Sequence, residues 1–279
     1  MVTISRQAGS GGDEIARLLA EELDWRLLDN EVLERLLVGK GFPQGEVGTY
    51  TERKPDLWHR ISAEKDRYLH FLKLASYEFA RPGGCVIVGR GGQVLFADVP
   101  GIVRVRVVAP LQDRVARIRE KHGDDERRAL HAVQRADGER AGFHRCLLQT
   151  SWDSPDLYDL IINTHLISAR TAADLIKRTL GSNEVLKRQK AASRKLEELY
   201  LGQKAMIAIL YEQKLPILCL EIEVNNGTVT LKGTARDNPS IERCRELAAG
   251  MFRLSKINNE IHFSPRYMER MAGLHREDV

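Results

Sequence analysis

A glycine-rich turn near the start of the chain has the composition of an anion-binding loop. The apolar run Val2 to Ile4 predicts a strand, the turn Gly9-Ser10-Gly11-Gly12 follows it, and a helical pattern then extends from Asp13 to Leu23. Glycines let backbone N–H groups approach a phosphate, and the amino terminus of a helix adds unpaired N–H donors and a positive dipole end. These residues therefore predict a phosphate-binding site.

The turn departs from the standard phosphate-binding pattern G-x-x-x-x-G-K-[ST] at both the first glycine and the lysine. Arg6 stands where the first glycine belongs, and Gly12 stands where the lysine belongs. Arg6 is a candidate for the missing cation, because a guanidinium offers planar, paired donors to phosphate oxygens. Asp13 and Glu14 argue against an anion, since their carboxylates would repel it at the helix start. The alternative is a tight strand-to-helix turn without a ligand.

Length and composition are those of an ordinary globular protein. The 279 residues suit one large or two modest domains, and 43% of them are hydrophobic. Lys and Arg number 43 against 39 Asp and Glu, a net charge of +4 that is too close to balance to indicate a nucleic-acid partner. The four cysteines lie far apart, which favours free thiols and argues against a zinc site. The sequence shows no membrane-spanning run and no signal peptide, so we expect a cytoplasmic protein.

Short apolar runs alternate with helical patterns over the first 180 residues. The expected strands are Arg26 to Leu28, Cys85 to Val88, Ile102 to Val108 and Leu160 to Ile162, and the expected helices include Leu111 to His122 and Ala169 to Leu180. This alternation is typical of a parallel sheet flanked by helices. A polar helical segment, Pro43 to Ala80, interrupts the series where it could cover a substrate.

The expected sheet places several polar residues at one edge. Ligands bind outside the carboxyl ends of parallel strands, so we expect Arg6, Asp29 and the turn Gly89-Arg90-Gly91 to converge there with the glycine-rich loop. Asp29 has a second interpretation, because it also stands where it can cap the helix that starts near Glu31. One residue could serve both roles.

Beyond residue 180 the composition changes. Residues 181–198 are rich in Lys, Arg, Glu and Ala at helical spacing, which predicts a charged connecting helix. An amphipathic helix is expected at Leu199 to Leu210. A hairpin follows, with strands Cys219 to Val224 and Thr228 to Gly233 on either side of Asn226-Gly227. A second helix, Pro239 to Phe252, and a last strand, Lys256 to Phe263, complete the series. These elements predict a small separate α+β domain of order α-β-β-α-β over residues 199–264, and residues 265–279 form a tail.

Several segments of the first 180 residues, taken in order, resemble the cytidylate kinase-like branch of the nucleoside monophosphate kinases. They are Ile4 to Gln7, Gly9 to Gly12, the strand end Leu28-Asp29, Val86 to Gly91 and Tyr158 to Thr164. The resemblance implies a three-layer α/β P-loop fold with a monophosphate-binding insertion and a mobile lid. It also implies transfer of the γ-phosphoryl group of ATP, with Mg²⁺, to CMP, dCMP or a related small acceptor.

The resemblance also implies roles for individual residues. Those expected to hold the donor phosphates are Gly9, Ser10, Gly11, Gly12 and Asp13, and those expected to contact the acceptor are Asp29, Arg90 and Asp137. Asp137 and Arg140 match the Asp-x-x-Arg pattern of the lid. Arg6, Arg140 and Arg117 are the expected catalytic cations, because phosphoryl transfer depends on stabilising charge on the reacting oxygens. The alternative for Arg117, and for Arg114 and Arg119 on the same helix, is a solvated charged face.

Residues 199–264 resemble a BON domain through the hairpin Val224 to Thr234 and the closing strand Ile257 to Ile261. Such modules are associated with membranes, hydrophobic ligands or other proteins, and they usually occur in exported proteins. Here the module follows a kinase-like domain and no export signal is visible, so we expect regulation, a protein partner or self-association instead of membrane contact.

Two functions therefore stand as hypotheses. The first is a kinase that phosphorylates CMP or a related small acceptor, and the second is a weak or inactive nucleotide-binding sensor whose C-terminal module relays the bound state. The missing lysine favours the sensor. The presence in one chain of Arg6, Asp29, Arg90, Asp137 and Arg140 favours the kinase, which we take as the main expectation.

Overall fold

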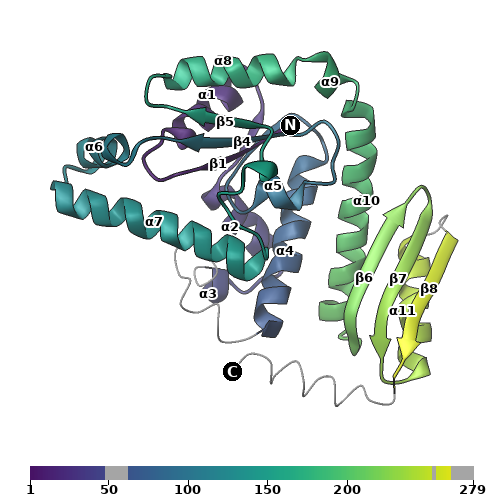
Figure 1. Ribbon diagram of the computed structural model, residues 1–279. Helices are drawn as coiled ribbons and strands as arrows, with labels where there is room; N and C mark the ends of the chain where they lie inside the picture. The colour runs from purple at the N-terminus through teal and green to yellow at the C-terminus, as the bar shows by residue number, and fades with distance from the viewer. Residues whose placement is uncertain (48–61, 253–255, 265–279) are drawn as a thin grey trace. The chain divides into compact units, whose positions relative to one another are not determined.

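The computed structural model describes residues 1–47, 62–252 and 256–264, which separate into two units (Figure 1). The first unit comprises the described residues of 1–60 and 79–195, and the second comprises those of 61–78 and 196–279. The expected polar segment Pro43 to Ala80 contributes helices α3 (Gln44–Val47) and α4 (Ser62–Ala80). Its middle, residues 48–61, and the expected tail lie outside the described residues.

A five-stranded parallel sheet forms the centre of the first unit. In spatial order its strands are β2 (Arg26–Leu28), β3 (Cys85–Val88), β1 (Val2–Arg6), β4 (Val103–Val108) and β5 (Leu160–Asn163). Ile4 of β1 lies between Val88 of β3 and Val105 of β4. The alternation in the sequence predicted this parallel sheet correctly, and its carboxyl ends share one edge because all neighbours are parallel.

Helices cover both faces of this sheet (Figure 1). Helices α1 (Gly12–Glu22) and α8 (Ala169–Leu180) form one core with the inward side chains of β1, which include Ile4. Side chains alternate along a strand, so Thr3 points to the opposite face, where it meets the short helix α5 (Gly92–Leu95). The remaining helices of this unit include α2 (Asn30–Gly39), α6 (Leu111–His122), α7 (Glu126–Leu147) and α9 (Asn183–Leu186).

The charged connecting helix and the amphipathic helix expected after it form one continuous helix. Helix α10 runs from Gln189 to Ile207 and continues into a π-helical turn, Ala208–Glu212. The expected boundary at residues 198 and 199 falls inside it. Gly202 lies within α10. A Cβ there would lie 3.0 Å from the carbonyl oxygen of Ile222, so the missing side chain lets the helix approach the neighbouring strand.

The second unit contains a three-stranded sheet in the order β6 (Ile217–Asn225), β7 (Thr228–Ala235), β8 (Lys256–Phe263). Asn226 and Gly227 both have positive φ, as the predicted two-residue hairpin turn requires. Strand β8 is parallel to β7, and α11 (Asn238–Met251) makes the connection between them. Met206, Leu231 and Ala248 bring α10, β7 and α11 into one core. The predicted small sheet domain of order α-β-β-α-β is therefore present.

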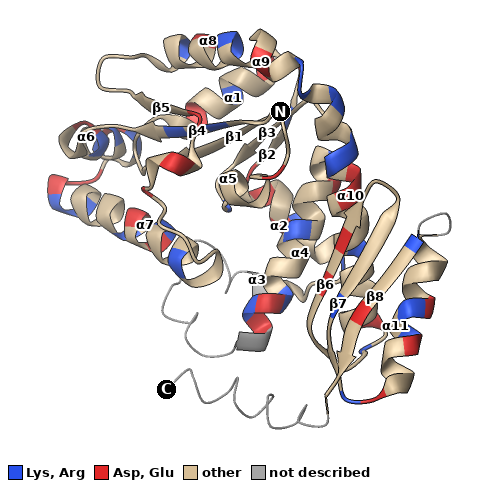
Figure 2. Ribbon diagram, turned by 45° about the vertical axis from the view of Figure 1, so that its right-hand side comes forward, with Lys and Arg blue, Asp and Glu red and all other residues tan. Residues whose placement is uncertain are grey.

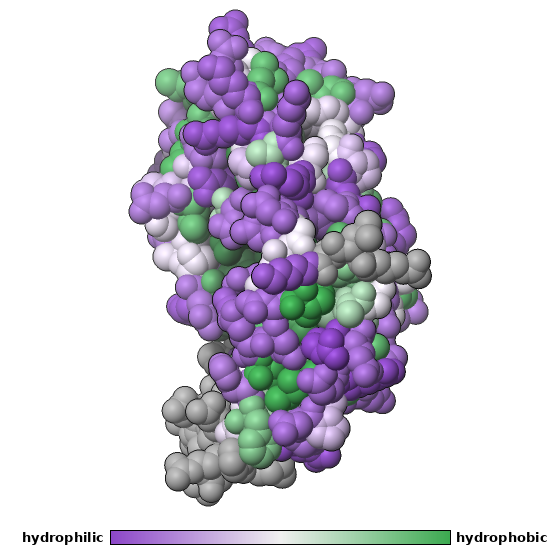
Figure 3. Space-filling view, turned by 90° about the vertical axis from the view of Figure 1, so that its right-hand side faces the viewer, coloured by the Kyte–Doolittle hydropathy of each residue, from purple (hydrophilic) through white to green (hydrophobic). Residues whose placement is uncertain are grey.

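The surface is polar over most of the parts that the figures display. Basic and acidic residues are interspersed on α8 and α11, in agreement with the small net charge (Figure 2). On the face shown in Figure 3, hydrophobic residues occur in small separate patches among hydrophilic ones. No helix in the described ranges is both long and apolar enough to cross a membrane.

Helix α4 packs within the second unit through a histidine. The side-chain amide of Gln203 donates to His70 Nδ1 at 3.0 Å, and the rings of His70 and Tyr211 lie 5.9 Å apart between centroids. Burial, together with the nearby charge of Lys73, lowers the pKa of His70 to about 4. His70 is therefore neutral in the folded protein at neutral pH.

We expect the free energy of unfolding to fall as the pH is lowered from about 6.5 to about 4. The unfolded chain protonates His70 near its ordinary pKa of 6.5, whereas the folded protein keeps it neutral down to about 4, so the unfolded state binds more protons in this window. The loss from this group is up to about 3 kcal/mol. Urea unfolding across the window checks it.

The His70→Gln variant should show a weaker pH dependence than the wild type over the same window. His122 is exposed on α6 and serves as the matched control, so His122→Gln should follow the wild type. Equal pH dependence in all three proteins would contradict the assignment to His70.

Candidate functional site

The loop between β1 and α1 contains several backbone N–H groups that no described residue pairs with. Gly9 and Gly11 have φ of +76° and +81°, and Gly11 caps α1 without a side-chain hydrogen bond. Among the described residues, no acceptor pairs with the backbone N–H of Gly9, Gly11, Gly12 or Asp13. Unpaired N–H groups at the amino terminus of an eleven-residue helix form a site for an anion.

Ser10 gives the loop its shape from inside. It is fully buried, its Oγ donates to the carbonyl oxygen of Gln7 at 2.8 Å, and its own carbonyl oxygen accepts from Thr164 Oγ1 at 2.8 Å. The predicted contact of Ser10 with donor phosphates stays a prediction. Its observed contacts make it a structural residue of the loop.

Arg6 fills the space that a side chain at position 12 would occupy. A Cβ built on Gly12 would lie 2.4 Å from Arg6 Cβ and 2.9 Å from Arg6 Cγ, which is closer than atoms can approach. Arg6 is only 7% exposed, and its Nε donates to Asp13 Oδ1 at 2.9 Å. A lysine at position 12 is therefore sterically incompatible with Arg6. The cation beside this loop comes from the strand before it.

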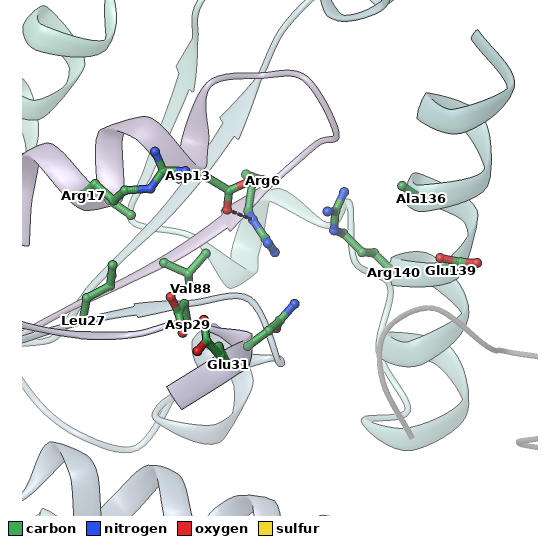
Figure 4. Close-up of a pocket in the computed structure, with 12 residues that line it drawn as sticks. Arg6, Asp13, Arg17, Leu27, Asp29, Glu31, Val88, Ala136, Glu139 and Arg140 are labelled. Carbon is green, nitrogen blue, oxygen red and sulfur yellow. Dashed lines mark hydrogen bonds and ion pairs between the residues drawn. The ribbon is translucent and has the colours of Figure 1, made fainter. Parts of the chain in front are cut away.

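A cavity of about 370 Å³ adjoins the loop at the carboxyl edge of the sheet (Figure 4). Its lining residues come from β1, α1, β2, α2, β3 and α7, and they are Arg6, Asp13, Ala16, Arg17, Leu27, Asp29, Asn30, Glu31, Val88, Ala136, Glu139 and Arg140. Arg6 and Arg140 extend toward one another from opposite sides, while Asp29 and Glu31 lie below them. Two guanidinium groups that face each other across a cavity suit an anion between them.

The structure brings together four of the predicted site residues outside the glycine turn. Arg6 and Asp29 line the cavity as expected, together with Asp13 and Arg140. The glycine-rich turn, residues 9–12, and the turn Gly89-Arg90-Gly91 were also expected there, but they are not among the residues that line it. Sequence reasoning missed Arg17, Asn30, Glu31 and Glu139, which also line it. Asn30 and Glu31 follow Asp29 directly, so their position after the strand end could have predicted that they line the site. Nothing in the sequence around Glu139 predicts its place there.

Asp29 caps α2, as one of its two interpretations required. Its Oδ1 accepts a hydrogen bond from the backbone N–H of Val32 at 2.9 Å. The same residue lines the cavity, so the cap leaves it available to a ligand there. The predicted contact with an acceptor stays a prediction.

Arg90 lies behind the cavity and orients one of its walls. It has φ of +52° between Gly89 and Gly91, both at +70°, and it is 4% exposed. Its Nε donates to Asn30 Oδ1 at 3.0 Å, and its Nη2 lies 3.7 Å from Glu34 Oε1. Because Asn30 lines the cavity, Arg90 acts on it through this hydrogen bond. Direct contact of Arg90 with an acceptor phosphate stays a prediction.

Asp137 ties α7 to the glycine-rich loop. Its Oδ1 accepts from the backbone N–H of Ala8 at 2.8 Å, and its Oδ2 accepts from Arg114 Nη1 at 2.5 Å. Arg140 Nη1 lies 3.4 Å from the same carboxylate. The two residues of the Asp-x-x-Arg pattern therefore interact with each other, and only Arg140 reaches the cavity.

Arg114 was missed, because the alternative offered for it was a solvated helix face. It is 7% exposed, and besides Asp137 it donates to the carbonyl oxygens of Ala109 at 3.0 Å and Ala8 at 3.3 Å. Arg119 on the same helix is exposed, as expected. The local sequence does not indicate which of Arg114 and Arg119 is buried, because their burial depends on which elements pack against α6.

Arg117 supports the loop from the side. Its guanidinium donates to Thr164 Oγ1 at 2.9 Å, to the carbonyl oxygen of Thr164 at 2.7 Å and to that of Gly9 at 3.3 Å. Arg117 thus joins α6, the end of the Tyr158 to Thr164 segment and the loop. Its predicted catalytic role stays a prediction, and the observed contacts describe a positioning residue.

A buried aromatic group supports the strand that carries Arg6. Trp152 Nε1 donates to Ser5 Oγ at 2.7 Å, and the buried Arg106 guanidinium lies 4.7 Å from the Trp152 ring. Burial raises the pKa of the Tyr158 hydroxyl, which donates to the carbonyl oxygen of Trp152 at 2.7 Å. Trp152 thus anchors its loop to β1.

No cluster of three or more His, Cys, Asp or Glu side chains within the described ranges is arranged to hold a metal ion. A magnesium ion needs less from the protein when phosphates are present, because it is usually bound by one or two carboxylates together with phosphate oxygens and water. Asp13 is the carboxylate next to the loop amides and also lines the cavity.

Comparison with known proteins relates this chain to one family. A model of the cytidylate kinase-like family matches residues 1–166. A cytidylate kinase of Ignicoccus hospitalis is 30% identical over 184 residues, which cover 64% of this chain and 98% of that protein. A cytidylate kinase of Methanosarcina barkeri is 24% identical over 184 residues, covering 65% of this chain and 96% of that protein.

A solved structure shows the same fold at lower identity. It is that of an uncharacterized protein from Eubacterium ventriosum, which is 22% identical, with a TM-score of 0.50, and the match covers 65% of this chain and 98% of that chain. This likeness concerns the fold alone.

Replacement of Arg114 by methionine should lower the free energy of unfolding by about 3 kcal/mol, because it leaves the half-buried carboxylate of Asp137 without its closest cation and removes the buried guanidinium's hydrogen bonds to the loop. Arg119→Met on the same helix is the matched control and should change stability by about 0.5 kcal/mol or less. Urea unfolding of both variants measures the difference. Equal stabilities would show that Arg114 does not brace the loop.

Proposed function

The chain belongs to the cytidylate kinase-like family, and on that basis we propose that it transfers a phosphoryl group from ATP to CMP, dCMP or a related small acceptor. Family membership supports a nucleotide or small-molecule kinase, and the finer assignment of the acceptor is the proposal. The observation that carries it is that the side chain of Arg6 lies where a side chain at position 12 would begin, and that Arg6 lines the cavity beside the loop. The chain lacks the usual lysine, and we take Arg6 to be the cation that replaces it.

The loop amides and Arg6 form the proposed donor side. Gly9, Gly11 and Gly12 direct unpaired N–H groups to the start of α1, where the helix dipole adds a favourable field for phosphate oxygens. Arg6 supplies full positive charge at the same place, and its fork of donors can span two oxygens. These residues would hold ATP through its phosphates.

Asp13 is the residue proposed to hold Mg²⁺. Its Oδ1 accepts from Arg6 Nε, and Oδ2 makes no hydrogen bond to any residue that the structure describes. A free carboxylate oxygen next to a phosphate cradle fits the modest ligand set that magnesium takes from kinases. When bound, the ion would neutralise charge on the phosphate oxygens.

The opposite wall of the cavity is the proposed acceptor side. Arg140 extends from α7 toward Arg6, so an acceptor phosphate and the transferring group would lie between two fixed cations. Asp29, Asn30 and Glu31 offer acceptors to hydroxyl and amino groups of a nucleoside. Arg90 fixes Asn30, while Asp137 and Arg117 keep α7 and the loop in place.

One observation favours the second candidate function, a nucleotide-binding sensor with slow or no transfer. The ion pair between Arg6 and Asp13 offsets part of the charge that Arg6 would present to ATP. A sensor of this kind would use the C-terminal unit, whose α-β-β-α-β order supports the BON-like assignment, to associate with a protein partner or a second copy of the chain. Turnover separates the two functions, because a sensor binds nucleotide without releasing ADP.

Arg6→Ala should weaken ATP binding more than CMP binding, whereas Arg90→Ala should weaken CMP binding more than ATP binding. Each change should lower kcat/KM by about 100-fold or more, as expected when a cation that stabilises the reacting phosphates, or that fixes a cavity wall, is removed. Calorimetric titration with each nucleotide and a coupled assay of ADP release give the two affinities and the rate.

Arg119→Ala is the control for these variants, since Arg119 is exposed on α6 and does not line the cavity. It should match the wild type in affinity and rate. Equal effects of Arg6→Ala and Arg90→Ala on both ligands would defeat the assignment of donor and acceptor sides. Binding of nucleotides without turnover in the wild type would favour the sensor.

The proposed replacement of a lysine at position 12 by Arg6 can be tested by restoring the lysine and removing the arginine. Gly12→Lys alone should destabilise the protein by about 1–3 kcal/mol, because its Cβ would overlap the side chain of Arg6. Adding Arg6→Gly should remove the overlap and restore both stability and ADP release. A double variant no better than Gly12→Lys alone, in stability and in rate, would show that Arg6 does not stand in for the lysine.

A further inference from the structure

Asp13 lies at the start of α1, lines the cavity and forms an ion pair with Arg6. Its Oδ1 accepts a hydrogen bond from Arg6 Nε at 2.9 Å, which Figure 4 marks with a dashed line. The Arg6 side chain is 8% exposed, whereas that of Asp13 is 55% exposed. A carboxylate that faces solvent therefore supplies negative charge to a guanidinium that is almost fully buried.

A phosphate group at the loop would compete with this carboxylate. The N–H groups of Gly11 and Gly12 have no acceptor among the described residues, and they belong to the same helix start as Asp13. A phosphate drawn to them would approach Arg6 and Asp13 together, and two negative charges at close range repel each other. Asp13 thus opposes the binding of a phosphate to Arg6.

The other charges of the cavity do not offset this repulsion. The charged side chains among the described residues that line it are three arginines, Arg6, Arg17 and Arg140, and four carboxylates, Asp13, Asp29, Glu31 and Glu139. A cavity attracts an anion strongly when charge of the opposite sign dominates its lining. This lining has no excess of positive charge, so it offers little attraction to a triphosphate that arrives without a cation.

A divalent cation would change the effect of Asp13 from competition to support. Mg²⁺ is usually bound in proteins by one or two carboxylates together with phosphate oxygens. Asp13 Oδ2 makes no hydrogen bond to a described residue, so this oxygen is available to an ion while Oδ1 keeps its contact with Arg6. With the ion held there, the charge of Asp13 would no longer act against the phosphates.

We infer that Asp13 is a selectivity residue, which disfavours metal-free nucleoside triphosphate and favours the same nucleotide with its divalent cation. The inference rests on the proposed function where that function places the donor phosphates at the glycine-rich loop. It goes further by giving Asp13 a negative effect on binding in the absence of metal. A residue that only held the metal would have no such effect.

Asp13→Asn is the variant that tests this inference. Asparagine keeps a side-chain oxygen that can accept from Arg6 Nε, so the substitution removes the charge and leaves the hydrogen bond possible. Glu14→Gln is the matched control, because Glu14 is the next acidic residue in the same helical turn, is exposed and does not line the cavity. Both variants are made in the full chain, and circular dichroism establishes that each is folded.

Calorimetric titration with ATP is the measurement, first with EDTA and no divalent cation and then with Mg²⁺ in excess. The wild type should bind ATP about fivefold or more tightly with Mg²⁺, the lower range of coupling between two ligands. Asp13→Asn should bind metal-free ATP about fivefold more tightly than the wild type does, as expected when one partly exposed opposing charge is removed. Mg²⁺ should change the affinity of this variant less than about twofold, because the coupling depends on the carboxylate. Glu14→Gln should match the wild type in both buffers.

Two results would overturn the inference while leaving the proposed function intact. The first is metal-free ATP binding by Asp13→Asn that is no tighter than that of the wild type. The second is an equal gain in Glu14→Gln, because the general field at the helix start would then explain the effect.

The proposed function can fail separately, since the titration does not depend on turnover. If no nucleoside monophosphate gives ADP release while ATP binding follows the expected pattern, the kinase proposal fails and the selectivity of Asp13 stands. Undetectable ATP binding in the wild type and in Asp13→Asn under both conditions would overturn the inference together with the proposed donor site.

Discussion

The cation beside the glycine-rich loop can be carried by residue 6 or by residue 12, but the two side chains cannot coexist. The Cβ positions of these residues would lie 2.4 Å apart, so a long side chain on β1 requires glycine at the start of α1. The other features of the site follow from this exclusion. Arg6 approaches the loop from the strand side and lines the cavity, Asp13 accepts a hydrogen bond from Arg6 Nε, and the N–H groups of Gly9, Gly11 and Gly12 have no acceptor among the described residues. In the proposed function, Arg6 supplies the charge that a lysine at position 12 would otherwise bring to a phosphate.

Other buried side chains hold the loop in the shape that this arrangement needs. Asp137 of α7 accepts from the backbone of Ala8, Arg114 pairs with Asp137, and Arg117 connects Gly9 to Thr164. Buried ion pairs contribute little net stability, because desolvation offsets much of their attraction, but breaking one leaves a costly unpaired charge. In this structure the ion pairs and hydrogen bonds of these residues set the positions of neighbouring elements. They fix α6, α7 and the end of β5 relative to a loop that glycines would otherwise leave free to adopt several conformations.

The C-terminal unit combines segments that lie far apart in the sequence. Its core is complete in itself, with side chains from α10, β7 and α11, yet it also includes most of α4, which the sequence places between β2 and β3. The described contacts are the hydrogen bond from Gln203 to His70 and the packing of the Tyr211 ring against the rings of His70 and Phe71. The unit in which α4 packs is therefore not the one that its place in the sequence suggests.

The sequence by itself determined the order and type of the elements, because periodicity and turn chemistry are local. The runs Arg26 to Leu28 and Cys85 to Val88 and the helices Leu111 to His122 and Ala169 to Leu180 were predicted with their observed ends, and Asn226-Gly227 specified its hairpin. The expected strand order also indicated that Arg6 and Asp29 lie at one edge of the sheet, and the family resemblance added Arg140. Local pattern could not decide which arginine of α6 is buried, that α10 is continuous, or that α4 packs with residues more than a hundred positions away. Only the tertiary structure decided these points, because burial and steric exclusion depend on which surfaces meet, and side chains of the same type carry no record of their neighbours in space.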